Sequence, residues 1–485
     1  MKRLVIVSNR VMPVTSKKVM VGGLAAGVLA ALRESGGVWF GWSGNVSESP
    51  AAEPVLTSQG RISYLTCDLN ARDYDQYYNG FANQNLWPLF HYRLDLTNFE
   101  RDWYESYRRV NQDMAHKLLP YLTGDDLIWV HDYHMIPFGE ELRHMGVADP
   151  IGFFVHTPFP PADLLITLPC HENLFRSLLS YDLVGFQTAN DLRNFHDYIS
   201  RETGGTVDPD GTVHAHGRIM QSGVFPIGID TEDFVALGET HEAQRQAQRL
   251  AQSLIGRDLI VGVDRTDYSK GLLTRLRAFE LLLETYPIDR SRVHLLQVTP
   301  PSREAVPEYA RMERELDALS GHINGRFAEF DWVPIRYIHR AYNRRELAGF
   351  FRVSRVGLVT PSRDGMNLVA KEYVAAQDPD NPGVLVLSRF AGAARQMDRA
   401  LVVNPFDVYA ISEAIQEALE MPLDERKGRW SEMLEDLRRE DIDHWRESFV
   451  SKLVAVNRKQ AAGAAGAAGA AGALRAVGGG KKRAG

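Results

Sequence analysis

The chain has 485 residues, of which 44% are hydrophobic and 24% are charged, which is enough for two large domains with cores of their own. Its net charge of -7 disfavours a broad basic face, so we expect no nucleic acid partner. Since no strongly apolar run reaches about 18 residues, we also expect no membrane span.

The two cysteines, Cys67 and Cys170, lie far apart and form neither a disulfide framework nor a metal-ligand spacing. The apolar run near the N-terminus is too short for a signal peptide. Together these features predict a cytoplasmic protein.

Short apolar runs in the first half predict buried strands at residues 4–7, 39–42, 127–130, 151–155, 183–186 and 224–229. Gly22 and Gly23 precede an Ala- and Leu-rich helix expected at residues 24–32. A Gly pair there lets a ligand approach the backbone just before a helix, but it also suits a turn or close packing. The sequence leaves both interpretations open.

Residues 74–92 are rich in aromatic and polar side chains, among them Tyr78 and Trp87. We expect a loop here. Aromatic rings stack on the apolar faces of sugars, so the segment fits a sugar site and fits a packed surface loop equally well.

Two polar clusters follow predicted strands in the first half. The first is His131-Asp132-Tyr133-His134, in which a metal site is disfavoured because no third ligand has a compatible spacing. The second is His156, which stands between a strand and a rigid Pro-containing segment. His156 fits a role in a site or a purely structural role.

The second half repeats the alternation of strands and helices. Strands are expected at residues 259–263, 293–298, 356–360, 383–387 and 402–403, and helices at 241–254, 272–286, 367–377 and 411–419. Arg265 and Lys270 lie between a strand and a helix, where two cations could hold a diphosphate. They could equally pair with Asp264 and Asp267 in a surface loop.

The stretch from Ser362 to Tyr373 organises the second half. Asp364-Gly365 marks a tight turn between a strand and a helix, and the free N–H groups at the helix start favour an anion. Asp364 could grip a small polar ligand, and Glu372 in the second helical turn could accept hydrogen bonds from ribose hydroxyls. An ordinary Asp-Gly turn is the alternative.

Six polar residues are expected just past strand ends: Arg10, Asp132, His156, Arg265, Arg303 and Asp364. In open α/β sheets, ligands bind at the carboxyl ends of the strands. We therefore predict an α/β protein with two doubly wound, Rossmann-like parallel sheets that face a shared cleft.

Several motifs resemble those of trehalose-6-phosphate synthases, a family of retaining glycosyltransferases with the GT-B fold. They occur in order from residue 1 to about residue 455, at residues 7–10, 22–24, 39–42, 86–88, 131–134, 156–160, 267–271 and 363–373. Thr157 is a departure, because some relatives carry an aliphatic residue after the corresponding histidine, which leaves the acceptor fit in doubt.

The resemblance implies transfer of glucose from a nucleotide-glucose, usually UDP-glucose, to glucose 6-phosphate, with retention and without a cofactor or a metal ion. By resemblance, the donor is held by Gly22, Gly23, Arg265, Lys270, Tyr342, Asp364, Gly365, Met366, Asn367, Leu368, Val369 and Glu372. The acceptor is held by Arg10, Tyr78, Trp87, Asp132 and Arg303. His156 and Asp364 contact the transferred glucose, and with Asp132, Arg265 and Lys270 they form the catalytic set. A front-face mechanism, in which the leaving phosphate helps to remove the acceptor proton, needs no carboxylate nucleophile.

We predict an acceptor-side domain over residues 1–232 and a nucleotide-sugar domain over residues 233–460, whose last helices pack back on the first domain. Residues 461–485, with their Ala-Ala-Gly repeats, are expected to be a disordered tail. Assembly into a dimer or tetramer is compatible with the sequence.

Two other functions remain as alternatives to glucosyl transfer to glucose 6-phosphate: a glucosyl transfer to glycerol 3-phosphate, and a silent sugar-phosphate sensor. A nicotinamide dehydrogenase is disfavoured because the G-x-G-x-x-G fingerprint is missing.

Overall fold

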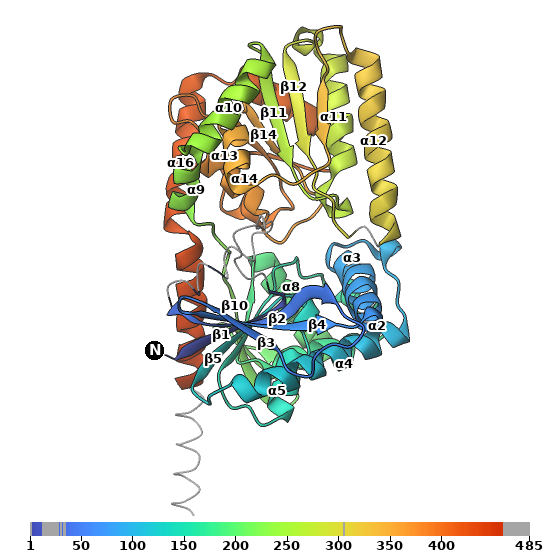
Figure 1. The fold of residues 1–485 in the computed structure, drawn as a ribbon, viewed down its shortest axis with the longest axis vertical. Helices are drawn as coiled ribbons and strands as arrows, with labels where there is room; N and C mark the ends of the chain where they lie inside the picture. The colour runs from blue at the N-terminus through green and yellow to red at the C-terminus, as the bar shows by residue number, and fades with distance from the viewer. Residues whose placement is uncertain (1, 12–28, 30–31, 33–34, 304–305, 459–485) are drawn as a thin grey trace, which may run out of the picture.

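Two sheets, one in each half of the molecule, organise the computed structural model, which describes residues 2–11, 29, 32, 35–303 and 306–458 (Figure 1). Gly22, Gly23, most of the helix expected at 24–32 and the tail from residue 461 lie outside the described residues. None of the helices in the described residues is long and apolar enough to cross a membrane.

The first sheet follows the order β3-β4-β2-β1-β5-β6-β7-β10-β9-β8. Its strands are β1 (Arg3–Arg10), β2 (Gly37–Val46), β3 (Val55–Gln59), β4 (Ile62–Leu69), β5 (Asp126–His131), β6 (Ile151–Phe154), β7 (Leu183–Phe186), β8 (Thr206–Val207), β9 (Thr212–Ala215) and β10 (Arg218–Val224). In sheet order, the seven strands β4, β2, β1, β5, β6, β7 and β10 run parallel. Antiparallel pairing adds β3 at one edge and β9 and β8 at the other. The order reverses between β1 and β5, where a doubly wound sheet binds its ligand.

The second sheet is parallel throughout its described strands and follows the order β13-β12-β11-β14-β15-β16. Its strands are β11 (Asp258–Val263), β12 (Val293–Val298), β13 (Ile335–Ile338), β14 (Val356–Val359), β15 (Val384–Ser388) and β16 (Leu401–Val403). Here the order reverses between β11 and β14. The fold class predicted from the sequence, with two doubly wound sheets, is confirmed.

Helices cover both sheets, and this explains why the central strands are continuous apolar runs. The longer ones are α4 (Arg101–Leu118), α8 (Ala189–Glu202), α10 (His241–Leu254), α11 (Leu272–Thr285), α12 (Pro307–Phe327) and α15 (Val408–Glu420). The domain boundary expected at residues 232 and 233 falls within α9 (Thr231–Gly238), at the crossing between the two sheets.

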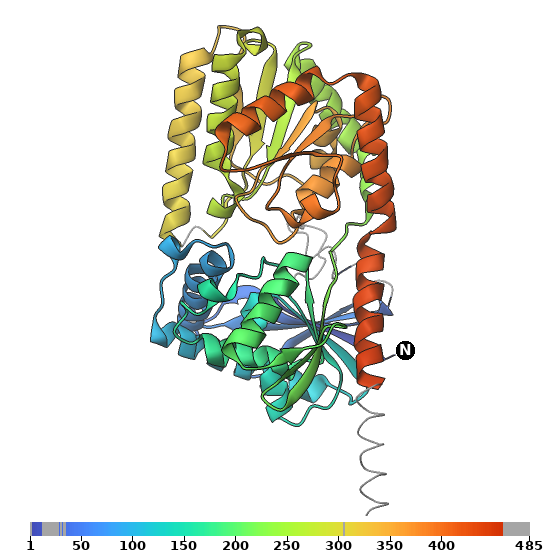
Figure 2. The same ribbon diagram turned by 180° about the vertical axis from the view of Figure 1, so that it is seen from behind.

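The last helices run along both domains (Figure 2). After α16 (Leu423–Arg439), a helix over residues 442–458 descends along the first sheet. Phe449 stacks on Trp129 of β5 with ring centroids 4.5 Å apart, and Trp445 packs 4.7 Å from the same ring. A methyl group at Gly152 of β6 would lie 2.7 Å from Phe449, so the glycine makes room for this helix.

Two local expectations are wrong. The strand expected at 224–229 ends at Val224, because Pro226 has no N–H to donate to a ladder. The loop expected at 74–92 is largely helical, with a wide π-helix, η1 (Tyr74–Leu86), followed by α3 (Trp87–Phe90). Tyr74, Tyr77 and Phe81 recur at helical spacing, a signal that outweighs the high Asn content.

Candidate functional site

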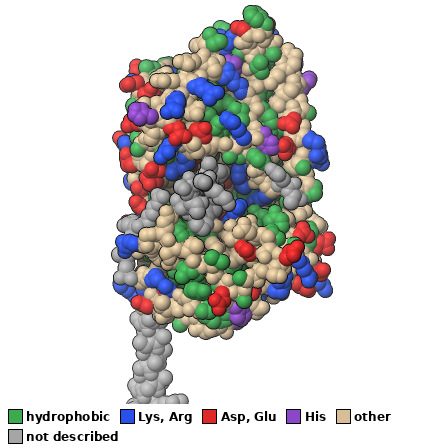
Figure 3. Space-filling model, viewed as in Figure 1, with side chains coloured by type: hydrophobic (Ala, Val, Ile, Leu, Met, Phe, Trp, Pro, Cys, Tyr) green, Lys and Arg blue, Asp and Glu red, His purple; other side chains and the backbone are tan. Residues whose placement is uncertain are grey.

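The carboxyl ends of the two sheets meet around a cavity of about 400 Å³ between the domains. From the first domain it is lined by Trp87, His91, Asp132, Tyr133, His134, His156, Thr157, Gln187 and Ile227. From the second it is lined by Val263, Asp264, Arg265, Lys270, Val298, Pro300, Arg303, Tyr342, Arg344, Leu347, residues 364–369 and Glu372. Figure 3 shows Lys and Arg side chains over the upper half of the molecule, several of them close to where the domains meet.

Most of the site residues expected from the sequence line this cavity, including five of the six residues assigned to strand ends. Arg10 is the exception, because it is the last residue of β1 and is exposed. Tyr78 also lies outside the lining. Of the residues assigned to the donor, Gly22 and Gly23 lie outside the described part of the chain.

A row of rings connects Arg10 to the cavity. The Arg10 guanidinium lies 5.8 Å from the centre of the Trp42 ring, and that ring lies 5.2 Å from the ring of Tyr78. Tyr78 in turn stacks on His134, with centroids 5.9 Å apart. Since His134 lines the cavity, Arg10 and Tyr78 extend its wall toward the outside.

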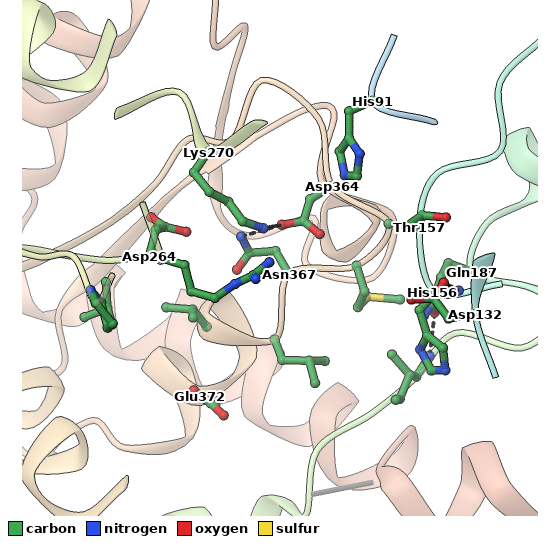
Figure 4. A pocket seen from close by; sticks show the side chains of 18 of the residues that line it. His91, Asp132, His156, Thr157, Gln187, Asp264, Lys270, Asp364, Asn367 and Glu372 are labelled. Atoms are coloured by element: carbon green, nitrogen blue, oxygen red, sulfur yellow. Dashed lines mark hydrogen bonds and ion pairs between the residues drawn. The ribbon is translucent and has the colours of Figure 1, made fainter. Parts of the chain in front are cut away.

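The C-terminal wall centres on a carboxylate that two side chains hold. Lys270 Nζ lies 2.5 Å from Asp364 Oδ2, and Asn367 Nδ2 donates to the same oxygen at 3.1 Å (Figure 4). The Asp364 N–H donates to the Phe390 carbonyl at 3.1 Å, which ties this loop to the loop after β15. The carboxylate is therefore fixed in position before any ligand arrives.

The helix α14 (Leu368–Ala375) begins against the same cavity. Asn367 precedes it with a φ of 73°, a conformation that Asn tolerates better than most residues, and makes no side-chain cap. The first N–H groups of the helix therefore lack a side-chain partner at a point where the helix dipole favours an anion.

Arg303 crosses from the second domain to the first. Its guanidinium lies 4.0 Å from the centre of the Trp87 ring and donates to the Tyr133 hydroxyl at 3.2 Å and to the Tyr309 hydroxyl at 2.7 Å. Asp267 lies 3.5 Å away. Burial alone would raise the pKa of Asp267, but the charges of Arg303, Arg265 and Lys270 lower it to about 2, so this carboxylate stays ionised.

Below the C-terminal wall lies a buried ion pair that the sequence pattern did not reveal. Arg275 is fully buried and donates to Asp264 Oδ2 at 2.7 Å, to Gln297 Oε1 at 3.0 Å and to Thr360 Oγ1 at 3.2 Å. The pair ties α11 to the ends of β11, β12 and β14. The one signal in the sequence is that Arg275 interrupts the apolar face of α11.

On the N-terminal wall, His156 is held by the buried His131 behind it and by the carboxylate of Asp132. His156 Nε2 lies 3.0 Å from His131 Nδ1, and the His156 N–H donates to Asp132 Oδ1 at 3.2 Å. Burial lowers the pKa of His156 to about 3 and places that of His131 well below its usual value, so both rings are neutral. Burial also raises the pKa of Asp132 to about 6.

The far end of the cavity carries Glu372 beside Tyr342 and Arg344. Burial raises the pKa of Glu372 to about 7, although the charge of Arg344 opposes the shift. A carboxyl group with this pKa can accept or donate a hydrogen bond near neutral pH, which suits a sugar hydroxyl.

The histidines of the segment 131–134 do not converge on a common point. His131 faces His156, whereas His134 stacks on Tyr78. Within the residues that the structure describes, no group of three or more His, Cys, Asp and Glu side chains could hold a metal ion.

Comparison with known proteins finds a matching family and similar relatives. The model of glycosyltransferase family 20 matches residues 3–455. The trehalose-6-phosphate synthase of Sinorhizobium fredii is 50% identical over 459 residues, covering 94% of this chain and 99% of the relative. That of Cronobacter sakazakii is 47% identical over 456 residues, covering 94% and 96%.

Two solved structures are similar over nearly the whole chain. The UDP-forming α,α-trehalose-phosphate synthase of Burkholderia xenovorans in complex with glucose 6-phosphate has a TM-score of 0.90 and 51% identity, covering 93% of this chain and 99% of that one. An Escherichia coli structure bound with UDP-2-fluoro glucose has a TM-score of 0.89 and 45% identity, covering 93% and 98%.

Proposed function

The chain belongs to glycosyltransferase family 20, and we propose that it transfers glucose from UDP-glucose to glucose 6-phosphate, giving α,α-trehalose 6-phosphate and UDP. The observation that carries the proposal is the cavity between the domains. One of its walls offers cations and a helix N-terminus for a diphosphate, and Arg303 reaches across it to Trp87, where it can bind a second phosphate.

The donor lies against the C-terminal wall. Its diphosphate lies near Arg265, Lys270 and the first turn of α14, and its nucleoside contacts Tyr342, Leu368 and Val369. Its ribose hydroxyls bond Glu372. The transferred glucose lies between His156 and Asp364, beside the backbone of residues 365–367. By family resemblance, Gly22 and Gly23 close over the donor.

The acceptor lies against the N-terminal wall. Its phosphate is bound by Arg303 and Arg10, and its ring stacks on Trp87 and Tyr78. Asp132 accepts a hydrogen bond from an acceptor hydroxyl. Arg303 already contacts Trp87 and Tyr133 across the domain boundary, so an acceptor phosphate beside it helps to hold the domains together.

Catalysis rests on charge. As the bond from the anomeric carbon to the diphosphate breaks, negative charge grows on the leaving phosphate, and Arg265, Lys270 and the helix terminus stabilise it. The Asp364 carboxylate accepts hydrogen bonds from Lys270 and Asn367, and the Asp132 carboxylate accepts one from the backbone N–H of His156. Because both carboxylates are held by these donors, the site fits a front-face mechanism that needs no carboxylate nucleophile. Since these cations lie beside the diphosphate, we expect activity to survive chelation by EDTA.

A cytoplasmic location is part of the proposal. Cys67 and Cys170 are both unpaired and buried, and burial raises the pKa of each thiol to about 12. Inert thiols of this kind suit a reducing compartment and serve no redox chemistry.

Release of nucleoside diphosphate from UDP-, ADP- and GDP-glucose, with and without glucose 6-phosphate, tests the function. We expect rapid UDP release only when UDP-glucose and glucose 6-phosphate are both present. Turnover with glycerol 3-phosphate in place of glucose 6-phosphate would overturn the acceptor assignment. Tight binding of both substrates without any turnover would indicate a sensor.

A further inference from the structure

A second cavity, of about 330 Å³, lies between the two domains on the other side of the loop that carries Asp364. We call it the arginine cavity. Three of its lining residues, Arg363, Arg389 and Arg395, come from the second domain, and Tyr92, Asp191 and Asn194 come from the first. None of these six residues lines the cavity assigned to the substrates.

A wall of closely packed backbone separates the two cavities. A methyl group at Gly365 would lie 1.9 Å from the His156 carbonyl oxygen, and one at Gly392 would lie 1.9 Å from the Gly365 carbonyl oxygen. The Gly392 N–H also donates to the Asp364 carbonyl at 3.2 Å. With no room for side chains at these contacts, a ligand in the arginine cavity would press directly on the backbone that positions His156 and Asp364.

The three arginines have no side-chain hydrogen bond or ion pair among the described residues, in contrast to the buried and paired Arg275. Arg363 lies over the Tyr92 ring at 3.7 Å and over Phe390 at 5.0 Å, and Arg389 lies 5.9 Å from Phe390. Stacking on rings orients a guanidinium but leaves the N–H groups at its edge without acceptors.

The acidic residues of the lining balance this charge only in part, since Asp191 interacts electrostatically with Arg363 but three arginines face it. Asp364 is paired with Lys270. Asp191 accepts from the Phe159 N–H at 3.0 Å and lies 2.5 Å from the Thr188 hydroxyl. Arg363 is half-buried, so leaving its charge unpaired is costly, whereas Arg389 and Arg395 are exposed at the cavity and free to turn toward a ligand. An anion that enters the cavity would offset the cost at Arg363.

We propose that the arginine cavity binds a small phosphate monoester whose phosphate is held by Arg363, Arg389 and Arg395. A guanidinium gives two parallel hydrogen bonds to phosphate oxygens, and a dianion matches several guanidinium groups better than a carboxylate does. Thr188 and Asn190, which also line the cavity, are hydroxyl and amide partners for the organic part of the ligand.

Binding there bridges the two domains and contacts the loop of Asp364. It is therefore coupled to donor binding, and the coupling is reciprocal. The arginine cavity is in this respect a regulatory site, distinct from the phosphate site assigned to Arg303 and Arg10.

Calorimetric titration of the UDP-saturated protein with inorganic phosphate and with glycerol 3-phosphate tests the proposal. UDP occupies the diphosphate site, which leaves the acceptor site and the arginine cavity. The double variant Arg389→Gln with Arg395→Gln should weaken binding at one class of sites, the arginine cavity, by about tenfold or more. Arg303→Gln should weaken binding at the other class, the acceptor site, and leave the arginine cavity unchanged. The matched control is Arg245→Gln with Arg249→Gln, which removes two exposed arginines of α10 and should change neither.

If the double variant binds both probes as the wild type and the matched control do, the proposal is wrong. Absence of a second class of sites in the wild type overturns it as well. If inorganic phosphate binds in the cavity but glycerol 3-phosphate does not, the monoester assignment is wrong. The readout is binding and needs no turnover, so the result holds whether or not the proposed reaction is confirmed.

Discussion

The two walls of the substrate cavity differ in charge. The C-terminal wall carries Arg265 and the pair of Lys270 with Asp364, and the buried pair of Arg275 with Asp264 lies beneath it. The N-terminal wall presents the neutral rings of His134 and His156 and a row of aromatic side chains. One wall suits a leaving diphosphate and the other suits sugar rings. In the function proposed above, the two substrates are therefore assigned to different domains.

Arg303 is the exception to this division, because it belongs to the charged domain but packs on Trp87 of the neutral one. Under the proposed assignment, a phosphate-binding group for the acceptor comes from the domain that binds the donor. Under that assignment, both substrates are held in position only when the walls are close together, which would couple substrate binding to closure of the domains.

Loss of the central cation should have the largest effect. We expect Lys270→Ala to lower kcat/KM about a thousandfold, because it removes a cation beside the leaving phosphate and leaves the Asp364 carboxylate unpaired. Turnover and calorimetry of UDP binding measure the loss. Lys117→Ala, which removes a lysine paired with Asp113 at 2.9 Å on α4, is the control and should retain activity. A loss below tenfold would contradict the charge assigned to this wall.

Separation of the walls should come next. We expect Gly365→Ala to lower kcat/KM about a hundredfold, because the added methyl group would lie 1.9 Å from the His156 carbonyl and force the two domains apart. Gly428→Ala in α16 is the matched control, since nothing lies within 4 Å of the methyl group it adds. Kinetics together with small-angle scattering test the change. Full activity of Gly365→Ala would show that the closed contact is not needed.

The strand ends can be predicted from the sequence. Asp132, His156, Arg265 and Asp364 each follow a short apolar run, and parallel strands bring such positions to one edge. This reasoning is local, because it needs only the apolar run and the polar residue that follows it. Arg303 is placed by the same pattern.

Most of what escaped prediction depends on contacts between distant segments. The pairing of Arg275 with Asp264 forms only when α11 packs under the sheet, and the stacking of Arg303 on Trp87 depends on how the domains dock. The arginine cavity was missed for the same reason, because its residues come from both domains. The helix at residues 74–90 was missed because the Asn content outweighed the aromatic spacing in our interpretation.

The exception provided by Arg303 can be tested by separating donor from acceptor binding. We expect Arg303→Ala to raise the acceptor KM roughly thirtyfold, which corresponds to a loss of about 2 kcal/mol of binding free energy, because charge-assisted hydrogen bonds to a phosphate are lost. Arg10→Ala should act in the same direction. Calorimetry should show UDP binding nearly unchanged in both variants. If either weakens UDP binding as much as Lys270→Ala does, the division between the two walls is wrong.

The smallest effect concerns Asp132, the one carboxylate that we assign to the acceptor on the neutral wall. Burial raises its pKa from 3.8 to about 6 in the folded protein. Between about pH 4 and pH 6 the native state therefore holds a proton that the unfolded state has released, and this group contributes less stability as the pH rises through that window. Asp132→Asn removes the dependence. We expect the stability of the variant relative to wild type to be about 1 kcal/mol greater at pH 8 than at pH 5, roughly 2–4 °C in Tm.

Thermal unfolding without ligands at the two pH values measures this difference, with Asp380→Asn on an exposed loop as a control that should show no such difference. A variant that loses stability relative to wild type as the pH rises would mean that the folded protein favours the charged form. The expected sign means instead that the protein retains a destabilising carboxylate, which fits a group kept to accept a hydrogen bond from the acceptor sugar.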